Sequence, residues 1–358
     1  MSTASLARKR IVRFDVWQHP SMLERFAREP DFEVQTLARE GKDAEAWAAL
    51  SQAHAYVISV AKDELPRQWW ASAELAARCP DLLVVSATGA GYDTVDVPAC
   101  TSAGILVVNQ AGANARSVAE MTFGLMLNLV HRISESDRRL KASKRNFSRE
   151  DLMGGELSGK TLGLVGIGHV GTLVAALGRA FGMNMLATDP NLSAEEISRR
   201  GATPTALNAL LAQSDFVSLH CPRDPRTLRM IDEQAFAAMK KGAVFVSTAR
   251  GGIHDEAALA AALRSGHLAG AGLDVWDQEP PPHAHPLLAL ENVVATFHTA
   301  GVTLEARRNM GAWSADQLIN LFRGRLAPRV VNPEVLPVFT RRFEASTGVL
   351  LAQRASRP

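Results

Sequence analysis

The sequence predicts an α/β fold with two parallel sheets. Short apolar runs alternate with amphipathic or alanine-rich helical stretches along most of the 358 residues, and this alternation is typical of repeated strand–helix–strand units. Most of the runs are continuously apolar, as expected for strands that helices cover on both faces. The runs are too numerous for one small sheet, so we divide them between two units.

The predicted elements follow one another along the chain. Strands are expected over residues 11–16, 55–59, 82–86, 105–109, 161–165, 184–188, 215–219, 243–247, 269–273 and 292–296. Helices are expected over residues 68–78, 169–181, 205–213, 256–265 and 304–323. A further helix around 117–130 is apolar nearly all round, so we expect it to be buried between domains or subunits. Gly324 is a good stop for the last long helix, and the residues after it are too few for another domain.

The composition excludes several classes of protein. Lys and Arg total 39 against 37 Asp and Glu, so the charge gives no reason to expect a nucleic-acid partner. Cys79, Cys100 and Cys221 are too few and too scattered for a disulfide framework or a zinc site. His283 and His285 have no further ligand nearby, so no metal is expected. No apolar run reaches the roughly 18–20 residues that span a bilayer, and we expect a cytoplasmic protein without a membrane partner.

The strongest local motif is a glycine-rich turn, Gly166-Ile167-Gly168-His169-Val170-Gly171. It follows a predicted strand and opens a predicted helix, which is the context of a dinucleotide-binding site. Gly166 would make the tight turn, Gly168 would let the backbone approach a pyrophosphate, and Gly171 would let the helix pack on the strand. The helix N-terminus would supply N–H groups and partial positive charge to the phosphates.

Asp189 closes the next predicted strand and completes this motif. A carboxylate at this position accepts hydrogen bonds from the adenosine ribose hydroxyls and disfavours a 2′-phosphate. Residues 190–192 contain no Arg or Lys that would compensate for such a phosphate. The cofactor is therefore predicted to be NAD, with NADP less favoured.

Three reactive side chains, Arg250, Glu279 and His298, each come shortly after one of the last three predicted strands. Ligands of an open parallel sheet bind beyond the carboxyl ends of its strands, so these side chains are expected to converge on the cofactor. Reduction of a 2-oxo acid needs a hydride and a proton, and His298 is the candidate acid. Glu279 would stabilise the imidazolium, and Arg250 would bind the substrate carboxylate and polarise the oxo group.

From about residue 11 to residue 333 the chain resembles the D-isomer-specific 2-hydroxyacid dehydrogenases, and residues 189–296 are most similar to their phosphoglycerate dehydrogenase branch. The segments that carry the resemblance are Gly89–Asp96, Asn114–Glu120, Gly159–Gly166, Ala249–Gly252 and Asp274–Trp276. The resemblance implies an NAD-dependent enzyme that interconverts a D-2-hydroxy acid and its 2-oxo acid. Its candidate substrates are 3-phosphoglycerate, hydroxypyruvate and glyoxylate, and its implied catalytic set is Arg250, Glu279 and His298.

The resemblance also assigns binding residues. Outside the glycine turn, the expected cofactor contacts are His220, Cys221, Pro222, Thr248, Ala249, Arg250, Asp274, His298, Ala300 and Gly301. Among them, Asp274 would hold the nicotinamide amide, and the segment 220–222 would form a wall near the adenosine. The expected substrate contacts are Thr88, Gly89, Ala90, Gly91, Arg250 and His298. The loop 88–91 would present backbone N–H groups to the substrate carboxylate.

The same resemblance implies two Rossmann-like parallel-sheet domains with an interdomain cleft, and a homodimer built largely through the cofactor domain. We predict a substrate domain over residues 1–110 that is completed by about 302–335. The NAD-binding domain is predicted over residues 111–301, and a C-terminal tail over residues 336–358.

Three positions depart from the family pattern. Ser247 stands where Asn is common, and Phe297 stands where Pro is common. Relatives that handle a phosphate tend to carry Arg in the loop after the predicted strand at 55–59, where this chain has only Lys62. Two alternatives stay open: an NAD(H)-sensing interaction protein of the corepressor type, and a formate or phosphite oxidiser of the same architecture.

Overall fold

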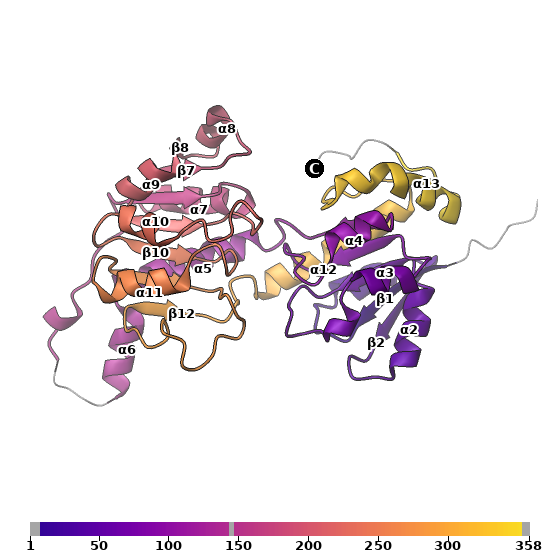
Figure 1. The fold of residues 1–358 in the computed structure, drawn as a ribbon, viewed down its shortest axis with the longest axis horizontal. Helices are drawn as coiled ribbons and strands as arrows, with labels where there is room; N and C mark the ends of the chain where they lie inside the picture. Colours follow the sequence, from indigo (N-terminus) through magenta and orange to yellow (C-terminus); the bar gives the residue numbers. More distant parts are fainter. Residues whose placement is uncertain (1–7, 143–146, 353–358) are drawn as a thin grey trace, which may run out of the picture. The chain divides into compact units, whose positions relative to one another are not determined.

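The computed structural model describes residues 8–142 and 147–352, which form two compact units (Figure 1). Unit 1 combines the residues up to Asn114 with those from Thr303 onward, and unit 2 spans Ala115–Val302. Residues 1–7 of the predicted substrate domain and 353–358 of the predicted tail lie outside the described residues. Each unit contains one parallel sheet, so the predicted α/β fold with two parallel sheets is confirmed.

Unit 1 is built around a five-stranded sheet. Its strands are β1 (Lys9–Phe14), β2 (Phe32–Leu37), β3 (Ala55–Ile58), β4 (Val84–Ala87) and β5 (Leu106–Val108). Its helices are α1 (Ser21–Phe26), α2 (Asp43–Ser51), α3 (Ala73–Arg78), α4 (Val97–Ser102), α12 (Leu304–Phe322) and α13 (Leu336–Thr347), with 3₁₀ turns η1 (Arg67–Trp69) and η3 (Pro333–Val335). The strand order is β2-β1-β3-β4-β5, and every pair is parallel.

Helices pack on both faces of this sheet. Ile11 of β1 belongs to a buried cluster with Leu318 of α12 and Phe339 of α13. The next residue, Val12, belongs to a separate cluster with Leu50 of α2. Successive residues of a strand point to opposite faces, so both faces of β1 are covered. This double burial explains why the predicted strands are continuously apolar.

The segment predicted as a C-terminal tail contains a buried helix. In α13, Phe339 and Phe343 are fully buried in the core of unit 1. Arg342 donates hydrogen bonds to the carbonyl oxygens of Ala103 and Gly104 at 2.7 and 2.9 Å. The segment is too short for a domain of its own, but one apolar face is enough to complete an existing core.

Unit 2 is built around a seven-stranded sheet. Its strands are β6 (Thr161–Val165), β7 (Asn184–Thr188), β8 (Thr203–Pro204), β9 (Phe216–Leu219), β10 (Val244–Ser247), β11 (Gly270–Leu273) and β12 (Val293–Ala295). Its helices are α5 (Ala115–Val130), α6 (Ile133–Lys141), α7 (His169–Ala180), α8 (Ala194–Arg199), α9 (Leu207–Gln213), α10 (Glu233–Ala238) and α11 (Glu256–Arg264), with a 3₁₀ turn η2 (Glu150–Leu152).

The parallel strands of unit 2 follow the order β12-β11-β10-β9-β6-β7-β8. The helices α9, α10 and α11 lie together on one face of the sheet (Figure 1), where Leu210, Phe236 and Leu259 share a buried cluster. The strand order reverses next to β6, because β6 lies between β7 and β9. Open α/β sheets bind ligands at the carboxyl ends of the strands beside such a reversal.

The long apolar helix, predicted to be buried between domains or subunits, packs on the sheet of unit 2. Its buried residues include Val118, Phe123 and Met126. A Cβ at Gly272 of β11 would lie 2.8 Å from the Cβ of Leu125, so glycine in the strand lets α5 approach the sheet closely. Most of the apolar surface of this helix is therefore used within one unit.

Two strands of the structure are not predicted from the sequence. β2 lies at the edge of its sheet, and Glu33, Gln35 and Thr36 are exposed, so its residues do not form a continuous apolar run. β8 contains two residues, which is too short for any pattern. Among the described residues, no helix combines the length and the apolar character that a membrane crossing requires.

His254 is a titratable residue in the core of unit 2. It is fully buried, its ring lies 5.2 Å from the ring of Phe245, and neither ring nitrogen has a hydrogen-bond partner among the described residues. Burial lowers the pKa of His254 to about 4. The unfolded chain takes up this proton near pH 6.5, so the folded state becomes less favoured as the pH falls from about 6.5 towards 4.

The variant His254→Leu removes this ionisable ring and keeps a side chain of similar size. Through His254 the wild-type protein is expected to lose about 2 kcal/mol of unfolding free energy between pH 7.5 and pH 5. The variant is expected to lack this part of the loss. Urea unfolding of both proteins at both pH values measures the difference, and equal pH dependence in the two proteins would contradict the prediction.

Candidate active site

The glycine turn joins β6 to α7 at the carboxyl edge of the unit 2 sheet. Gly166 has a φ of 93°, and a Cβ there would lie 2.8 Å from the backbone N of Cys221. A Cβ at Gly171 would lie 2.4 Å from the carbonyl oxygen of Gly166, so both positions require glycine. A Cβ at Gly168, the N-cap of α7, would meet nothing within 4 Å. The turn therefore borders open space at a helix N-terminus, where anions bind well.

Asp189 lies beside the glycine turn at the end of β7. Its Oδ2 accepts a hydrogen bond from the N–H of Ile167 at 3.1 Å, and its Oδ1 accepts one from the N–H of Asn191 at 3.0 Å. Sequence reasoning misses a cation at the same turn. Arg200 donates to the carbonyl oxygen of Ile167 at 2.7 Å and to Glu196 at 2.8 Å. No motif marks Arg200, because it reaches the turn from the end of α8.

The segment after β9 closes one side of the glycine turn. The backbone of His220 and Cys221 lies against Gly166, at the distance that excludes a Cβ there. Nε2 of His220 lies 2.9 Å from Oγ of Ser218, and burial lowers the pKa of His220 to about 3, so its ring is neutral at pH 7. Burial raises the pKa of the Cys221 thiol to about 11, so this cysteine is protonated and poorly nucleophilic. Pro222 follows directly.

His298 and Glu279 form a hydrogen-bonded pair. Nδ1 of His298 lies 2.8 Å from Oε2 of Glu279, and their side chains are 39% and 31% exposed. Oε1 of Glu279 accepts from the backbone N–H of Trp276 at 3.1 Å. Burial by itself would raise the pKa of Glu279, but the hydrogen bond and charge of His298, the Trp276 N–H and the charge of Arg250 together lower it. Glu279 is therefore ionised at neutral pH and oriented towards the imidazole.

Asp274, at the end of β11, holds the loop that carries His298. Its side chain is buried and accepts hydrogen bonds from the hydroxyl of Thr296 at 2.6 Å and from the N–H groups of Thr299 and Ala300, both at 2.9 Å. The N–H of His298 donates to the backbone carbonyl oxygen of Asp274 at 2.7 Å. The sequence does not predict that Asp274 anchors this loop. Its Oδ2 atom accepts one hydrogen bond there and can accept another.

Arg250 follows β10 and lies close enough to Glu279 for its charge to lower the pKa of that carboxyl. Its Nη1 donates to the carbonyl oxygen of Ala249 at 2.7 Å. The loop after Arg250 packs on the loop that precedes Glu279, since a Cβ at Gly251 would lie 1.9 Å from the carbonyl oxygen of Trp276. Two residues before Arg250, the hydroxyl of Thr248 lies 3.2 Å from that of Thr122 in α5. The structure thus brings Arg250, Glu279 and His298 together.

The loop of residues 88–91 belongs to unit 1, after β4. The N–H of Thr88 donates to Ile58 at 3.0 Å. Among the described residues, the N–H groups of Gly89, Ala90 and Gly91 have no acceptor. Three of the four predicted residues therefore present unused backbone donors.

Asn109 and Gln110, which follow β5, hold the loop 88–91, and no sequence motif marks them. The backbone N–H of Gln110 donates to the carbonyl oxygen of Gly89 at 2.8 Å, and its side chain donates to that of Ala87 at 3.3 Å. The side chain of Asn109 donates to the carbonyl oxygen of Ala90 at 2.7 Å. Gln110 is fully buried and accepts from Gln317 of α12 at 2.8 Å. These bonds use the carbonyl oxygens of the loop and leave its N–H groups open.

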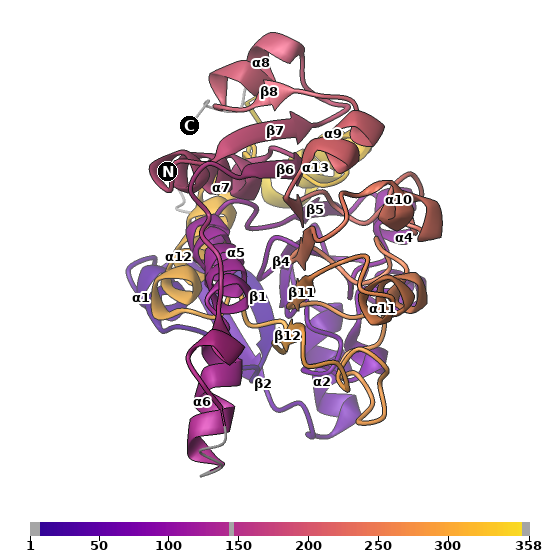
Figure 2. The same cartoon turned by 90° about the vertical axis from the view of Figure 1, so that its left-hand side faces the viewer.

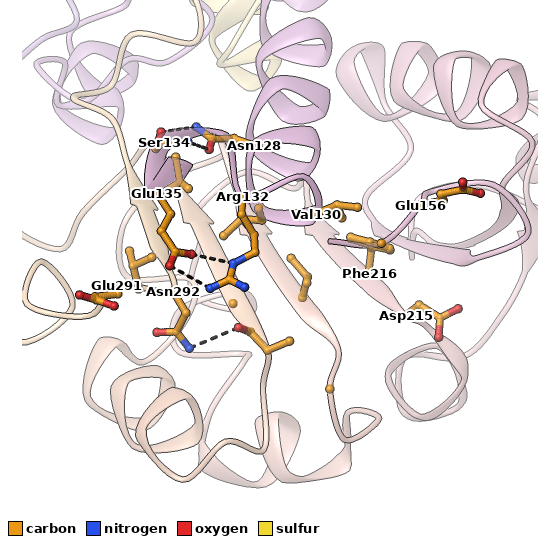
Figure 3. Close-up of a pocket in the computed structure, with 18 of the residues that line it drawn as sticks. Asn128, Val130, Arg132, Ser134, Glu135, Glu156, Asp215, Phe216, Glu291 and Asn292 are labelled. Carbon is orange, nitrogen blue, oxygen red and sulfur yellow. Dashed lines mark hydrogen bonds and ion pairs between the residues drawn. The ribbon is translucent and has the colours of Figure 1, made fainter. Parts of the chain in front are cut away.

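A cavity of about 530 Å³ lies at the amino ends of the unit 2 strands, on the side of the sheet away from the glycine turn (Figure 3). It is bordered by Phe216 and Val244, the first residues of β9 and β10, and by Arg132 and Glu135, which pair at 2.7 Å. None of the predicted site residues lines it. Within the described part of the chain, no group of three or more His, Cys, Asp or Glu residues is placed to hold a metal ion.

Comparison with known proteins identifies the family. Residues 123–300 match the family model described as D-isomer specific 2-hydroxyacid dehydrogenase, NAD binding domain. Over 275 residues the chain is 39% identical to a glyoxylate reductase of Korarchaeum cryptofilum, a match that covers 76% of this chain and 82% of that relative. The chain belongs to the D-isomer specific 2-hydroxyacid dehydrogenase family. The matched NAD-binding domain contains the glycine turn, Asp189, Arg250, Glu279 and His298.

Other members of the family extend the comparison. A D-3-phosphoglycerate dehydrogenase of Archaeoglobus fulgidus is 41% identical over 266 residues, which are 74% of this chain and 50% of that relative. The chain thus spans about half the length of the phosphoglycerate dehydrogenases that it matches. The crystal structure of a glyoxylate reductase from Paecilomyes thermophila superposes with a TM-score of 0.80 at 27% identity, covering 91% of this chain and 99% of that chain.

Proposed function

We propose that the protein is an NAD-dependent oxidoreductase that interconverts a D-2-hydroxy acid and its 2-oxo acid. The observation that carries the proposal is the hydrogen bond between His298 and Glu279, with Arg250 close by, on the sheet edge that also bears the glycine turn. Family membership supports the same activity, because relatives are named D-3-phosphoglycerate dehydrogenase and glyoxylate reductase. Glyoxylate, hydroxypyruvate and 3-phosphohydroxypyruvate are the 2-oxo acids to test.

The residues around the glycine turn fit NAD. Gly168 borders open space where the pyrophosphate would lie, and Asp189 offers a carboxylate to the ribose hydroxyls, which favours NAD over NADP. Asp274 would bind the nicotinamide amide. The other proposed cofactor contacts are Gly166, His169, Val170, Gly171, His220, Cys221, Pro222, Thr248, Ala249, Arg250, His298, Ala300 and Gly301. When bound, NADH supplies the hydride that reduces the oxo carbon.

His298 is the proposed acid and base of the reaction. Its Nδ1 is held by Glu279, so Nε2 is the nitrogen left to face the substrate. In reduction Nε2 would give its proton to the oxo oxygen, and in oxidation it would take a proton from the hydroxyl. The ionised Glu279 stabilises the imidazolium form that this role requires.

Arg250 and the loop 88–91 are the proposed carboxylate-binding groups. A guanidinium binds a carboxylate through two parallel hydrogen bonds and polarises a neighbouring oxo group. The open N–H groups of Gly89, Ala90 and Gly91 are donors of the kind that bind a carboxylate. Within unit 2, Arg250 would hold the 2-oxo acid by its carboxylate, and His298 would protonate its oxo oxygen.

We also propose that the protein is a homodimer formed through unit 2. Helix α6 contains no buried residue and projects away from the sheet of its unit (Figures 1 and 2). Its Ile133 and Leu140 are 53% and 68% exposed. Ile133 and Leu140 are seven residues apart and so lie on one side of the helix, where a second copy of the chain could cover them. Arg138 and Arg139 of the same helix line the cavity of Figure 3.

The proposed activity is tested by NADH oxidation with the three 2-oxo acids. At least one acid is expected to be reduced, with NADH preferred to NADPH. Arg250→Lys is expected to raise the KM for that acid about 10-fold or more, because an ammonium cannot make the two-pronged contact. Arg264→Lys, an exposed residue at the end of α11, is the control and should leave the KM unchanged.

Three other results of these assays would contradict the proposed function or the role of Arg250. NADH binding without reduction of any acid would reject the proposed function in favour of a dinucleotide sensor. Oxidation of formate or phosphite, with none of the acids reduced, would identify the other alternative. An unchanged KM in Arg250→Lys would reject carboxylate binding by Arg250 while leaving the reaction itself in place.

The dimer is tested by sedimentation of wild-type protein and Leu140→Glu at micromolar concentration. The variant is expected to shift towards monomer, because it places a charge in an apolar contact. Leu228→Glu is the matched control, since Leu228 is also exposed on unit 2, at 57%. A monomeric wild-type protein, or a variant dimer as stable as the wild type, would contradict the proposal.

A further inference from the structure

His285 is a largely covered member of the loop that carries Glu279. Its side chain is 13% exposed, whereas His283, two residues earlier, is exposed. Nε2 of His285 lies 3.0 Å from Oε2 of Glu256, the first residue of α11, whose side chain is 12% exposed. The two histidines that resemble a metal pair in the sequence therefore have different surroundings, and one of them is hydrogen-bonded to a carboxylate.

Glu256 joins the two ends of this loop. While its Oε2 contacts His285, its Oε1 accepts a hydrogen bond from the N–H of Asp277 at 2.8 Å. A carboxylate is also favoured in the first turn of a helix by the helix dipole. The segment between Asp277 and His285, which contains Glu279, is thus closed by a single side chain.

The other ring nitrogen of His285 and its ring plane also make contacts. Its Nδ1 accepts from the N–H of Leu287 at 3.3 Å, which assigns the donated proton to Nε2. The rings of His285 and Trp276 form a T-shaped contact, with centroids 5.4 Å apart and planes at 76°. Leu287 is fully buried in the unit 2 core. The His285 end of the loop is therefore tied to the core of unit 2.

Trp276 connects this arrangement to the reacting groups. Its backbone N–H donates to Oε1 of Glu279 at 3.1 Å, and its indole N–H donates to the carbonyl oxygen of Thr296 at 3.0 Å. Thr296 lies in the loop held by Asp274, two residues before His298. A shift of Trp276 would therefore change the position of Glu279 and of the loop that bears its imidazole partner.

Asp277 extends the connection to Arg250. Its Oδ1 accepts from the N–H of Gly252 at 2.6 Å, two residues after Arg250. Glu256 accepts a hydrogen bond from the N–H of Asp277. It therefore holds the segment 276–277, which contacts Glu279 itself and the loops that carry Arg250 and His298.

From these contacts we propose that Glu256 and His285 are positioning residues that hold Glu279 in its hydrogen bond with His298. The proposal rests on the proposed function, since it concerns the groups that perform that reaction. Neither residue reaches a reacting atom; each acts through the loop 276–287. Loss of the His285 contact would leave Glu279 hydrogen-bonded to His298 for a smaller fraction of the time and slow proton transfer.

The test compares His285→Phe, which keeps the ring and loses both hydrogen bonds, with His283→Phe as the matched control. His285→Phe is expected to lower kcat about 10- to 100-fold, the scale of a small misplacement of catalytic groups. The KM for NADH is expected to stay the same, because the glycine turn is untouched. His285→Gln, which restores a donor to Glu256, is expected to recover part of kcat, and His283→Phe should behave as wild type.

A double-mutant cycle separates positioning from general destabilisation. If His285 acts through Glu279, adding His285→Phe to Glu279→Gln should lower kcat by less than about 2-fold, because coupled residues are not additive. A full multiplicative loss, or an unchanged kcat in His285→Phe alone, would overturn the proposal.

Hydrogen exchange of the peptide that contains Trp276 and Asp277 gives a readout that does not depend on turnover. His285→Phe is expected to speed exchange there, and His283→Phe is not. If the wild-type protein reduces none of the acids, the proposed function fails, and this exchange still decides whether His285 holds the loop. Equal exchange in wild type and His285→Phe would overturn the positioning role.

Discussion

One buried carboxylate determines where His298 lies. Asp274 accepts hydrogen bonds from Thr296, Thr299 and Ala300, and His298, within this loop, takes a left-handed φ of 47°. Such a conformation costs of order 1–3 kcal/mol for a residue with a side chain. Breaking the loop away from Asp274 would leave a buried carboxyl group and several donors without hydrogen bonds, which costs more. The strained conformation therefore persists, and it turns the imidazole towards Glu279.

Within unit 2, the remaining parts of the proposed site follow from the same sheet edge. Parallel strands deliver their carboxyl ends to one edge, so the glycine turn, Arg250 and the loop held by Asp274 come from separate strands and still lie on one side of unit 2. Glu256 and His285 further stabilise this side of the sheet, because their contacts close the loop that bears Glu279. In unit 1, Asn109 and Gln110 do the same for the loop 88–91, since they use its carbonyl oxygens and leave its N–H groups open.

The sequence predicts best what is encoded locally. The glycine turn is a short motif, and Arg250 is recognisable because it follows a buried strand. Contacts between distant segments are not encoded in this way: Arg200 reaches the glycine turn across 33 residues, and Glu256 meets His285 across 29. The same limit applies to α13, whose apolar face has no partner in its own stretch of sequence. Edge strand β2 is missed for a different reason, because its exposed polar residues interrupt the apolar pattern.

In the proposed reaction, His298 transfers the proton and bound NADH would supply the hydride. The most direct measurement is single-turnover reduction of the best 2-oxo acid by saturating NADH in wild type and His298→Ala, with NADH binding followed separately by fluorescence titration. The rate is expected to be at least about 100-fold lower in the variant, with NADH still bound. A variant that turns over at the wild-type rate would contradict this role of His298.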